Sequence, residues 1–127
     1  MPRARNKTFA AWEDGGATVL ARIVGNDGSV VTQASLTSIA YLVYDKSSAA
    51  NVITGSVTIA TSVFDTLQDD DRWPDTEPTG YNFRHALPAT AFPTGGHEYQ
   101  VEYKVTPDSG EVFYIVCEVE ALHTYTA

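Results

Sequence analysis

The sequence predicts an all-β protein in which about seven strands form a two-sheet antiparallel sandwich. Residues 97–105 and 112–121 alternate between apolar and polar side chains, with the two-residue period of half-buried strands. A short loop that contains Gly110 joins these two segments, as in a β-hairpin. The other strand-like segments are short, turn residues separate them, and no segment has a convincing helical period. This profile favours a sandwich over its alternative, a partly open small barrel.

The order of the expected elements divides the chain into an N-terminal arm, residues 1–16, and one sandwich domain, residues 17–127. Strands and shorter extended segments are expected along the domain at residues 17–24, 29–33, 39–44, 52–59 and 81–85. Gly55 is expected to mark a bulge or a strand break. Residues 62–67 fit a strand or one helical turn, because six residues are too few for periodicity to decide. Residues 68–80 form a long acidic loop, since two prolines and a run of aspartates exclude a central strand.

The size and composition of the chain suit a single folded domain. At 127 residues it can bury a core, and a hydrophobic content of 43% argues against disorder. The single cysteine, Cys117, excludes an intrachain disulfide and favours folding in a reducing cytoplasm. Cys117 shares its side of the last strand with Phe113, Ile115 and Val119, so we expect a buried, unreactive thiol. We expect neither a signal peptide nor a membrane-spanning segment.

The net charge of −8 is unevenly distributed along the chain. Arg3, Arg5 and Lys7 precede every acidic residue, whereas the remainder holds five basic and sixteen acidic side chains. An acidic body repels phosphate backbones, so we expect no nucleic-acid binding by the sandwich domain. The basic arm suits docking on a neighbouring copy, and a frayed, solvated terminus fits the same residues equally well.

Three aromatic residues are candidates for partner contacts, together with the basic residues of the arm. Phe9 and Trp12 give the arm an apolar anchor, and Trp73 lies in the polar loop between Arg72 and Pro74. Large aromatic side chains are enriched among the residues that anchor interfaces. Either Trp73 packs on a partner or a sugar ring, or it folds back and caps the end of the sandwich.

The acidic loop also contains weak candidates for a metal site, namely Asp69, Asp71 and Asp75. Carboxylates suit a hard cation such as Ca²⁺, but their spacing does not match an EF-hand loop, so we expect a solvated loop without a metal. The three histidines lie on different elements, and the sequence has neither a nucleophile elbow nor a phosphate-binding glycine loop. We therefore expect no enzymatic activity and no cofactor.

One pattern resembles a known class of sandwich domains. Leu87-Pro88 and a glycine-bearing turn precede the alternating segment that begins near Tyr99. This order resembles the E–F corner and F strand of immunoglobulin-like and fibronectin type III domains, where a tyrosine opens the strand. The resemblance implies an immunoglobulin-like sandwich, although the chain lacks the paired cysteines and the strand-C tryptophan of an antibody-type domain.

A second pattern resembles small proteins that are encoded among the structural genes of tailed phages and prophages. It consists of residues 63–68, 71–73 and 80–85 together with Gly15-Gly16-Ala17, and the likeness spans about residues 12–120. It implies a non-enzymatic virion protein, made in the host cytoplasm: a capsid decoration protein, or an accessory of the neck, tail or baseplate. Its partners would be other virion proteins or copies of itself, in a homo-oligomer or on a lattice.

The residues leave one alternative function open. A carbohydrate- or cell-surface-binding module can have the same sandwich fold. It would use Trp73, Tyr81 and the carboxylates of the acidic loop, with or without Ca²⁺.

Overall fold

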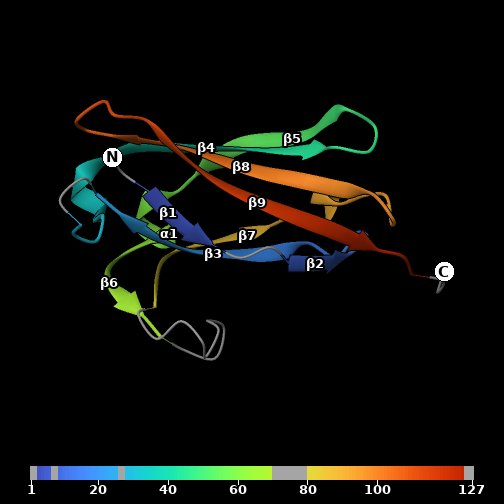
Figure 1. The fold of residues 1–127 in the computed structure, drawn as a ribbon, viewed down its shortest axis with the longest axis horizontal. Coiled ribbons are helices and arrows are strands. Elements are labelled where there is room, and N and C mark those ends of the chain that lie inside the picture. Colours follow the sequence, from blue (N-terminus) through green and yellow to red (C-terminus); the bar gives the residue numbers. More distant parts are fainter. Residues whose placement is uncertain (1–2, 7–8, 26–27, 70–79, 125–127) are drawn as a thin grey trace.

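The computed structural model describes residues 3–6, 9–25, 28–69 and 80–124, and for residues 3–6 and 9 it describes the backbone only. These residues form two sheets that pack face to face (Figure 1). The four-stranded sheet contains, in spatial order, β1 (Arg3–Asn6), β3 (Ala17–Val24), β7 (Tyr81–Leu87) and β6 (Val63–Gln68). The five-stranded sheet contains, in spatial order, β2 (Phe9–Trp12), β9 (Phe113–Leu122), β8 (Glu98–Pro107), β4 (Leu36–Asp45) and β5 (Ala50–Val57).

This strand order is that of an immunoglobulin-like sandwich. The order β1-β3-β7-β6 corresponds to strands A-B-E-D, and β9-β8-β4-β5 corresponds to G-F-C-C′. The predicted fold class is therefore confirmed, with seven strands within residues 17–127. The segment expected as an arm adds one edge strand to each sheet: β1 pairs antiparallel with β3, and β2 pairs parallel with β9.

Alternating side chains of both sheets fill the core between them. In β9 the buried residues are Phe113, Ile115, Cys117, Val119 and Ala121, and the residues between them are exposed. The prediction that Cys117 is buried is confirmed. In β8 the same alternation buries Tyr99, Val101, Tyr103 and Val105. A side-chain period of two thus places one face of each strand in the core and the other in solvent.

A tyrosine corner fixes the turn that leads into β8, as the resemblance to immunoglobulin-like domains implies. The backbone N–H of Thr94 donates to the hydroxyl of Tyr99 over 2.9 Å, and this hydroxyl donates to the carbonyl of Thr94 over 3.3 Å. The ring of Tyr99 packs edge-on against Phe92, with the ring centroids 5.3 Å apart.

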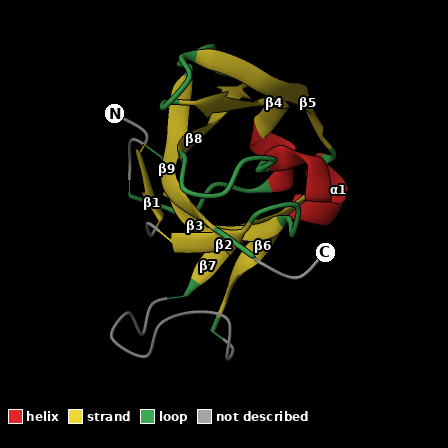
Figure 2. Ribbon diagram, turned by 90° about the vertical axis from the view of Figure 1, so that its right-hand side faces the viewer, coloured by secondary structure: helices red, strands yellow, loops and turns green. Residues whose placement is uncertain are grey.

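Three short helical segments connect the strands: η1 (Gln33–Ser35), α1 (Ile59–Ser62) and η2 (Ala89–Ala91). The segment that fitted a strand or a helical turn contains parts of both, because α1 ends at Ser62 and β6 begins at Val63. Figure 2 shows α1 on one lateral side of the sandwich, between β5 and β6. None of the helices in the described ranges is long and apolar enough to cross a bilayer.

Candidate interaction surface

The solvent-facing side of the five-stranded sheet is the candidate site for partner contacts, and we call it the outer sheet face. It consists of the outward residues of three adjacent strands. They are Tyr114, Val116, Glu118 and Glu120 of β9, Lys104, Glu102, Gln100 and Glu98 of β8, and Ala40, Leu42 and Tyr44 of β4. The strand register orders them in rows across the sheet, from an apolar end to an acidic end.

The apolar end of the outer sheet face exposes an aromatic and an aliphatic side chain, and a second exposed aliphatic side chain precedes β9. Tyr114 is 54% exposed, and Val112 and Val116 are also exposed. Val116 lies opposite Glu102, which in turn lies opposite the half-buried Leu42 of β4. Single apolar residues are common on protein surfaces, but neighbouring ones with a polar border are typical of interaction sites.

The acidic end brings like charges together. Glu98 and Glu120 are direct cross-strand partners, an arrangement that opposes sheet stability. Beside them Lys46 forms an ion pair with Glu118, with 3.2 Å between Nζ and Oε1. These four side chains border a hollow of about 160 Å³. Three glutamates against one lysine give this hollow a net negative charge, which suits a basic group of a partner.

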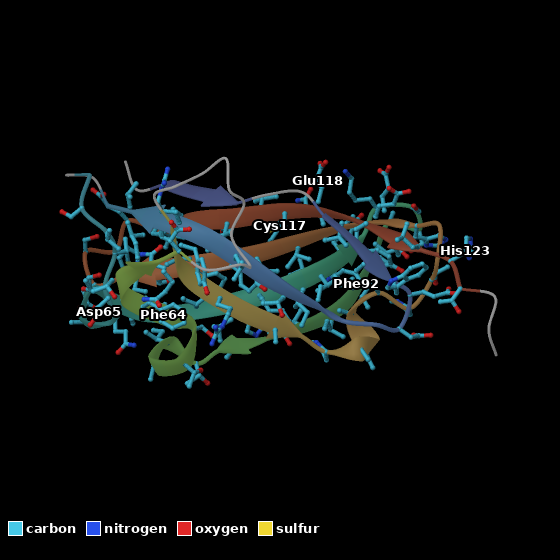
Figure 3. The ribbon with its side chains drawn as sticks, turned by 90° about the horizontal axis from the view of Figure 1, so that it is seen from below. Phe64, Asp65, Phe92, Cys117, Glu118 and His123 are labelled. Carbon is cyan, nitrogen blue, oxygen red and sulfur yellow. The ribbon has the colours of Figure 1, made fainter. Side chains whose placement is uncertain are left out.

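Figure 3 shows how these charges lie relative to the core. Glu118 projects outward from β9, whereas Cys117 and Phe92 lie within the body of the sandwich. Phe64 and Asp65 lie at the opposite end of the long axis from His123.

The structure separates the residues that the sequence grouped in the arm. Trp12 is 58% exposed at the edge of the five-stranded sheet, and it faces away from the core because its neighbour Ala11 is buried. The backbone of Phe9 is the parallel partner of Val119. Arg3 and Arg5 belong to β1, at the edge of the other sheet. Lys7 and Trp73 lie outside the described residues.

The described part of the chain gives little support to the residues that were candidates for metal or sugar binding. Asp69 is exposed at the end of β6, and Asp71 and Asp75 lie outside the described residues. The described residues include no cluster of three or more His, Cys, Asp or Glu side chains that could hold a metal. Tyr81, which the alternative carbohydrate-binding function would use, is 1% exposed and packs edge-on against Phe64, so its ring is not open to a sugar.

Sequence reasoning missed a polar network at the end of the sandwich where β8 begins. Asp45 contacts His97, with 2.8 Å between Oδ2 and Nδ1. Glu13 accepts the backbone N–H groups of Thr124 and Gly95, each over 2.8 Å. These two hydrogen bonds, together with the charge of the nearby His123, lower the pKa of Glu13 despite its partial desolvation. Such tertiary partners leave no periodic signal in a sequence.

Comparisons with known proteins give a likeness of fold and nothing closer. No family model matches the chain, and no curated protein matches it. Among solved structures, the chain is similar to CopC from Methylosinus trichosporium OB3b, with 14% identity and a TM-score of 0.49 over 98% of this chain and 94% of that chain. It is also similar to murine CRIg, with 9% identity and a TM-score of 0.43 over 98% of both chains. We take no functional residue from either protein.

Proposed function

We propose that this protein is a non-enzymatic structural component of a phage particle and that it works through contacts of the outer sheet face. The observation that carries the proposal is that one sheet exposes the like-charged pair Glu98 and Glu120 at one end of its outer face and Tyr114 at the other end, with Trp12 exposed on its edge strand β2. Both features oppose solubility or stability of an isolated domain, and both become favourable when a partner covers them.

The charged and apolar ends of the outer sheet face indicate which kind of partner surface would fit it. The acidic end requires a basic surface, and the apolar end requires an aliphatic or aromatic one. The chain itself carries a concentrated basic segment at Arg3 and Arg5, on the sheet opposite to the outer sheet face. A neighbouring copy that docks this segment on the acidic end makes a heterologous contact, which closes into a ring or extends along a lattice. A basic virion protein of another sequence would use the same face.

The part of the proposal that names a phage particle rests on the resemblance to proteins encoded among tailed-phage structural genes. Capsid decoration, neck, tail and baseplate positions all use repeated docking, in which many weak contacts are multiplied by avidity. The outer sheet face suits this role because it offers a moderate set of polar and apolar contacts instead of one deep site.

Light scattering of the full chain across a range of protein and salt concentrations tests this proposal. Self-assembly through the acidic face gives masses above the monomer mass of 13.8 kDa and weakens at high salt. Reversal of one charge in Glu120→Lys is expected to abolish this assembly. The matched reversal Asp69→Lys, at an exposed residue outside the face, should leave it unchanged.

A monomer at every concentration calls for a second assay, in which particles of the encoding phage are purified and probed for the protein. Loss of the protein from particles in Glu120→Lys alone supports contacts with other virion proteins. Normal incorporation of Glu120→Lys, or absence of the wild-type protein from particles, rejects the proposal.

A further inference from the structure

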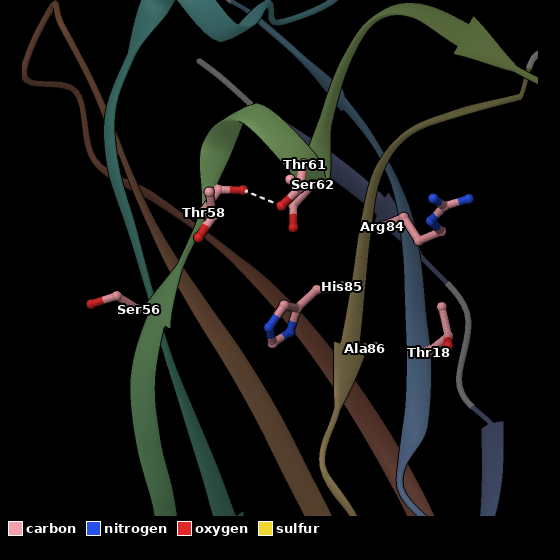
Figure 4. Close-up of a pocket in the computed structure, with 8 residues that line it drawn as sticks. All are labelled: Thr18, Ser56, Thr58, Thr61, Ser62, Arg84, His85 and Ala86. Carbon is pink, nitrogen blue, oxygen red and sulfur yellow. Dashed lines mark hydrogen bonds between the residues drawn. The ribbon is translucent and has the colours of Figure 1, made fainter.

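A second feature, independent of the outer sheet face, is a groove on the lateral side of the sandwich that α1 borders (Figure 4). Its volume is about 440 Å³, larger than the hollow at the acidic end of the outer sheet face. Eight residues line it: Thr18, Ser56, Thr58, Thr61, Ser62, Arg84, His85 and Ala86. Five of them carry hydroxyl groups, and the only charged one is Arg84, which is notable in a chain of net charge −8.

The groove follows an edge of β7 that lacks a neighbouring strand. Val63, the first residue of β6, lies opposite Phe83, and β6 then continues toward Tyr81. The segment Arg84–Leu87 therefore pairs with β3 on one side, and no described strand covers its other side. A sheet edge that is left open in this way is a template for another extended chain.

Successive side chains of β7 point to opposite faces of the four-stranded sheet. Figure 4 shows the imidazole of His85 directed toward β5, whereas Arg84 extends to the other side of β7. The guanidinium of Arg84 lies 5.2 Å from the ring centroid of Phe64, and this cation–π contact holds it in place. An extended segment in the groove would present its own side chains alternately to His85 and to Arg84.

The inner side of the groove is polar but uncharged. His85 Nδ1 lies 2.9 Å from the hydroxyl of Tyr103. Desolvation lowers the pKa of His85, and burial raises the pKa of Tyr103, so a neutral imidazole faces a protonated phenol. With the phenol as the donor, the imidazole proton lies on Nε2. This arrangement and the hydroxyl groups of α1 suit a small polar side chain such as serine or threonine.

We propose that the groove binds an extended segment of a partner protein, which adds to the four-stranded sheet as a strand beside Arg84–Leu87. The segment places small polar side chains against His85 and acidic side chains against Arg84. Four residues of β-strand span about 13 Å, which sets the length of the recognised stretch. Backbone hydrogen bonds supply affinity, and the alternating side chains supply selectivity, as in other cases of strand addition.

The probe for this site is the peptide acetyl-Glu-Thr-Glu-Ser-Glu-Thr-amide, titrated into the isotope-labelled full chain and followed by amide chemical shifts. We expect the shifts to concentrate at residues 84–87 and in α1. The substitution Arg84→Glu should weaken binding of this peptide by about tenfold, and it should strengthen binding of the peptide in which lysine replaces glutamate. The matched charge reversal Lys104→Glu, on the other sheet, should change neither affinity.

A third peptide, with alternate backbone amides methylated, separates strand addition from simple charge attraction. It keeps every side chain but lacks the donors that a sheet edge requires, so it should not bind. Equal binding of the methylated peptide, shifts along β5 in place of β7, or no shifts at millimolar peptide overturns the proposal. Because Arg84 lies on the sheet opposite to the outer sheet face, these outcomes leave the structural role proposed above unaffected.

Discussion

The Nδ1 atom of His97 lies 2.8 Å from Oδ2 of Asp45, and this contact joins the end of β4 to the residue that precedes β8. The other oxygen of Asp45 accepts the backbone N–H groups of Ser47 and Ser48, over 2.9 and 3.1 Å. Asp45 is only 5% exposed. Burial alone would raise the pKa of this carboxyl group, but the hydrogen bonds from His97 and Ser48 outweigh burial and hold the pKa below its ordinary value of 3.8.

The substitution Asp45→Asn should therefore destabilise the protein. Hydrogen bonds to a charged group contribute about 1.5–3 kcal/mol, and we expect a loss of this size in urea unfolding at pH 7. The folded pKa of Asp45 is depressed, so its contribution is fully present above pH 3.8 and is lost as the pH falls below that value. In Asp45→Asn the free energy of unfolding should decline less steeply as the pH falls, whereas the exposed control Asp69→Asn should keep the decline of the wild type. Parallel wild-type and Asp45→Asn profiles would contradict this assignment.

His85 should make stability depend on pH in a separate and higher window. Desolvation lowers its pKa below the ordinary value of 6.5, so the folded protein binds fewer protons than the unfolded chain as the pH falls below 6.5. Stability is thus present above pH 6.5 and declines below it. Thermal unfolding from pH 7 to pH 5 should show a steeper decline for the wild type than for His85→Gln, which does not titrate. A direct titration by NMR that places the pKa of His85 at or above 6.5 would refute this prediction.

Gly55 should not tolerate alanine, although it lies in a strand where alanine is usually preferred. A Cβ atom at this position would lie 2.7 Å from Cε1 of Tyr41. The Tyr41 ring cannot move away freely, because it packs against His85 and Tyr103 with centroid distances of 5.0 and 6.1 Å. We expect Gly55→Ala to cost about 1–3 kcal/mol in chemical unfolding. In a Tyr41→Leu background the cost should shrink, and a stabilising effect of Gly55→Ala in the wild type would disprove the clash.

Removal of the Tyr99 hydroxyl should weaken the corner that leads into β8. Tyr99→Phe keeps the ring against Phe92 but leaves the backbone N–H of Thr94 without its acceptor. We expect a loss of about 1–2 kcal/mol in the free energy of unfolding, measured with urea. Tyr114→Phe, at an exposed tyrosine, should change stability by less than about 0.5 kcal/mol. Equal effects of the two substitutions would show that the hydroxyl of Tyr99 contributes nothing specific.

The parts of the fold that could be predicted are those where burial leaves a local pattern. The last two strands alternate over ten residues, so their pairing and the inward side of Cys117 followed from sequence alone. The bulge or break expected at Gly55 is wrong: β5 runs unbroken from Ala50 to Val57, the irregularity in its pairing with β4 lies at Val43 and Tyr44, and the glycine makes room for the ring of Tyr41.

Asn82 illustrates what a local pattern cannot predict. A polar residue between the apolar Tyr81 and Phe83 is expected on the outward side of the strand. Asn82 is nevertheless completely buried. Its Oδ1 accepts the N–H of Ile23 over 2.7 Å, and its Nδ2 donates to the carbonyls of Ile23 and Val31. Those partners are more than fifty residues away in sequence. A local pattern also could not predict the acidic end of the outer sheet face, because Glu98 and Glu120 become neighbours only through the register of β8 and β9.

The parallel pairing of β2 with β9 has a consequence for the order in which the molecule is made. Residue 9 leaves the ribosome well before residue 119, its neighbour in the sheet, has been synthesised. The edge that β2 occupies therefore does not exist until β9 has been synthesised. Closing so long a loop is slow, so the five-stranded sheet becomes complete only after β9 has emerged. Until then β2 has no native neighbour in that sheet, and nascent chains held close together on one message are at risk of exchanging it.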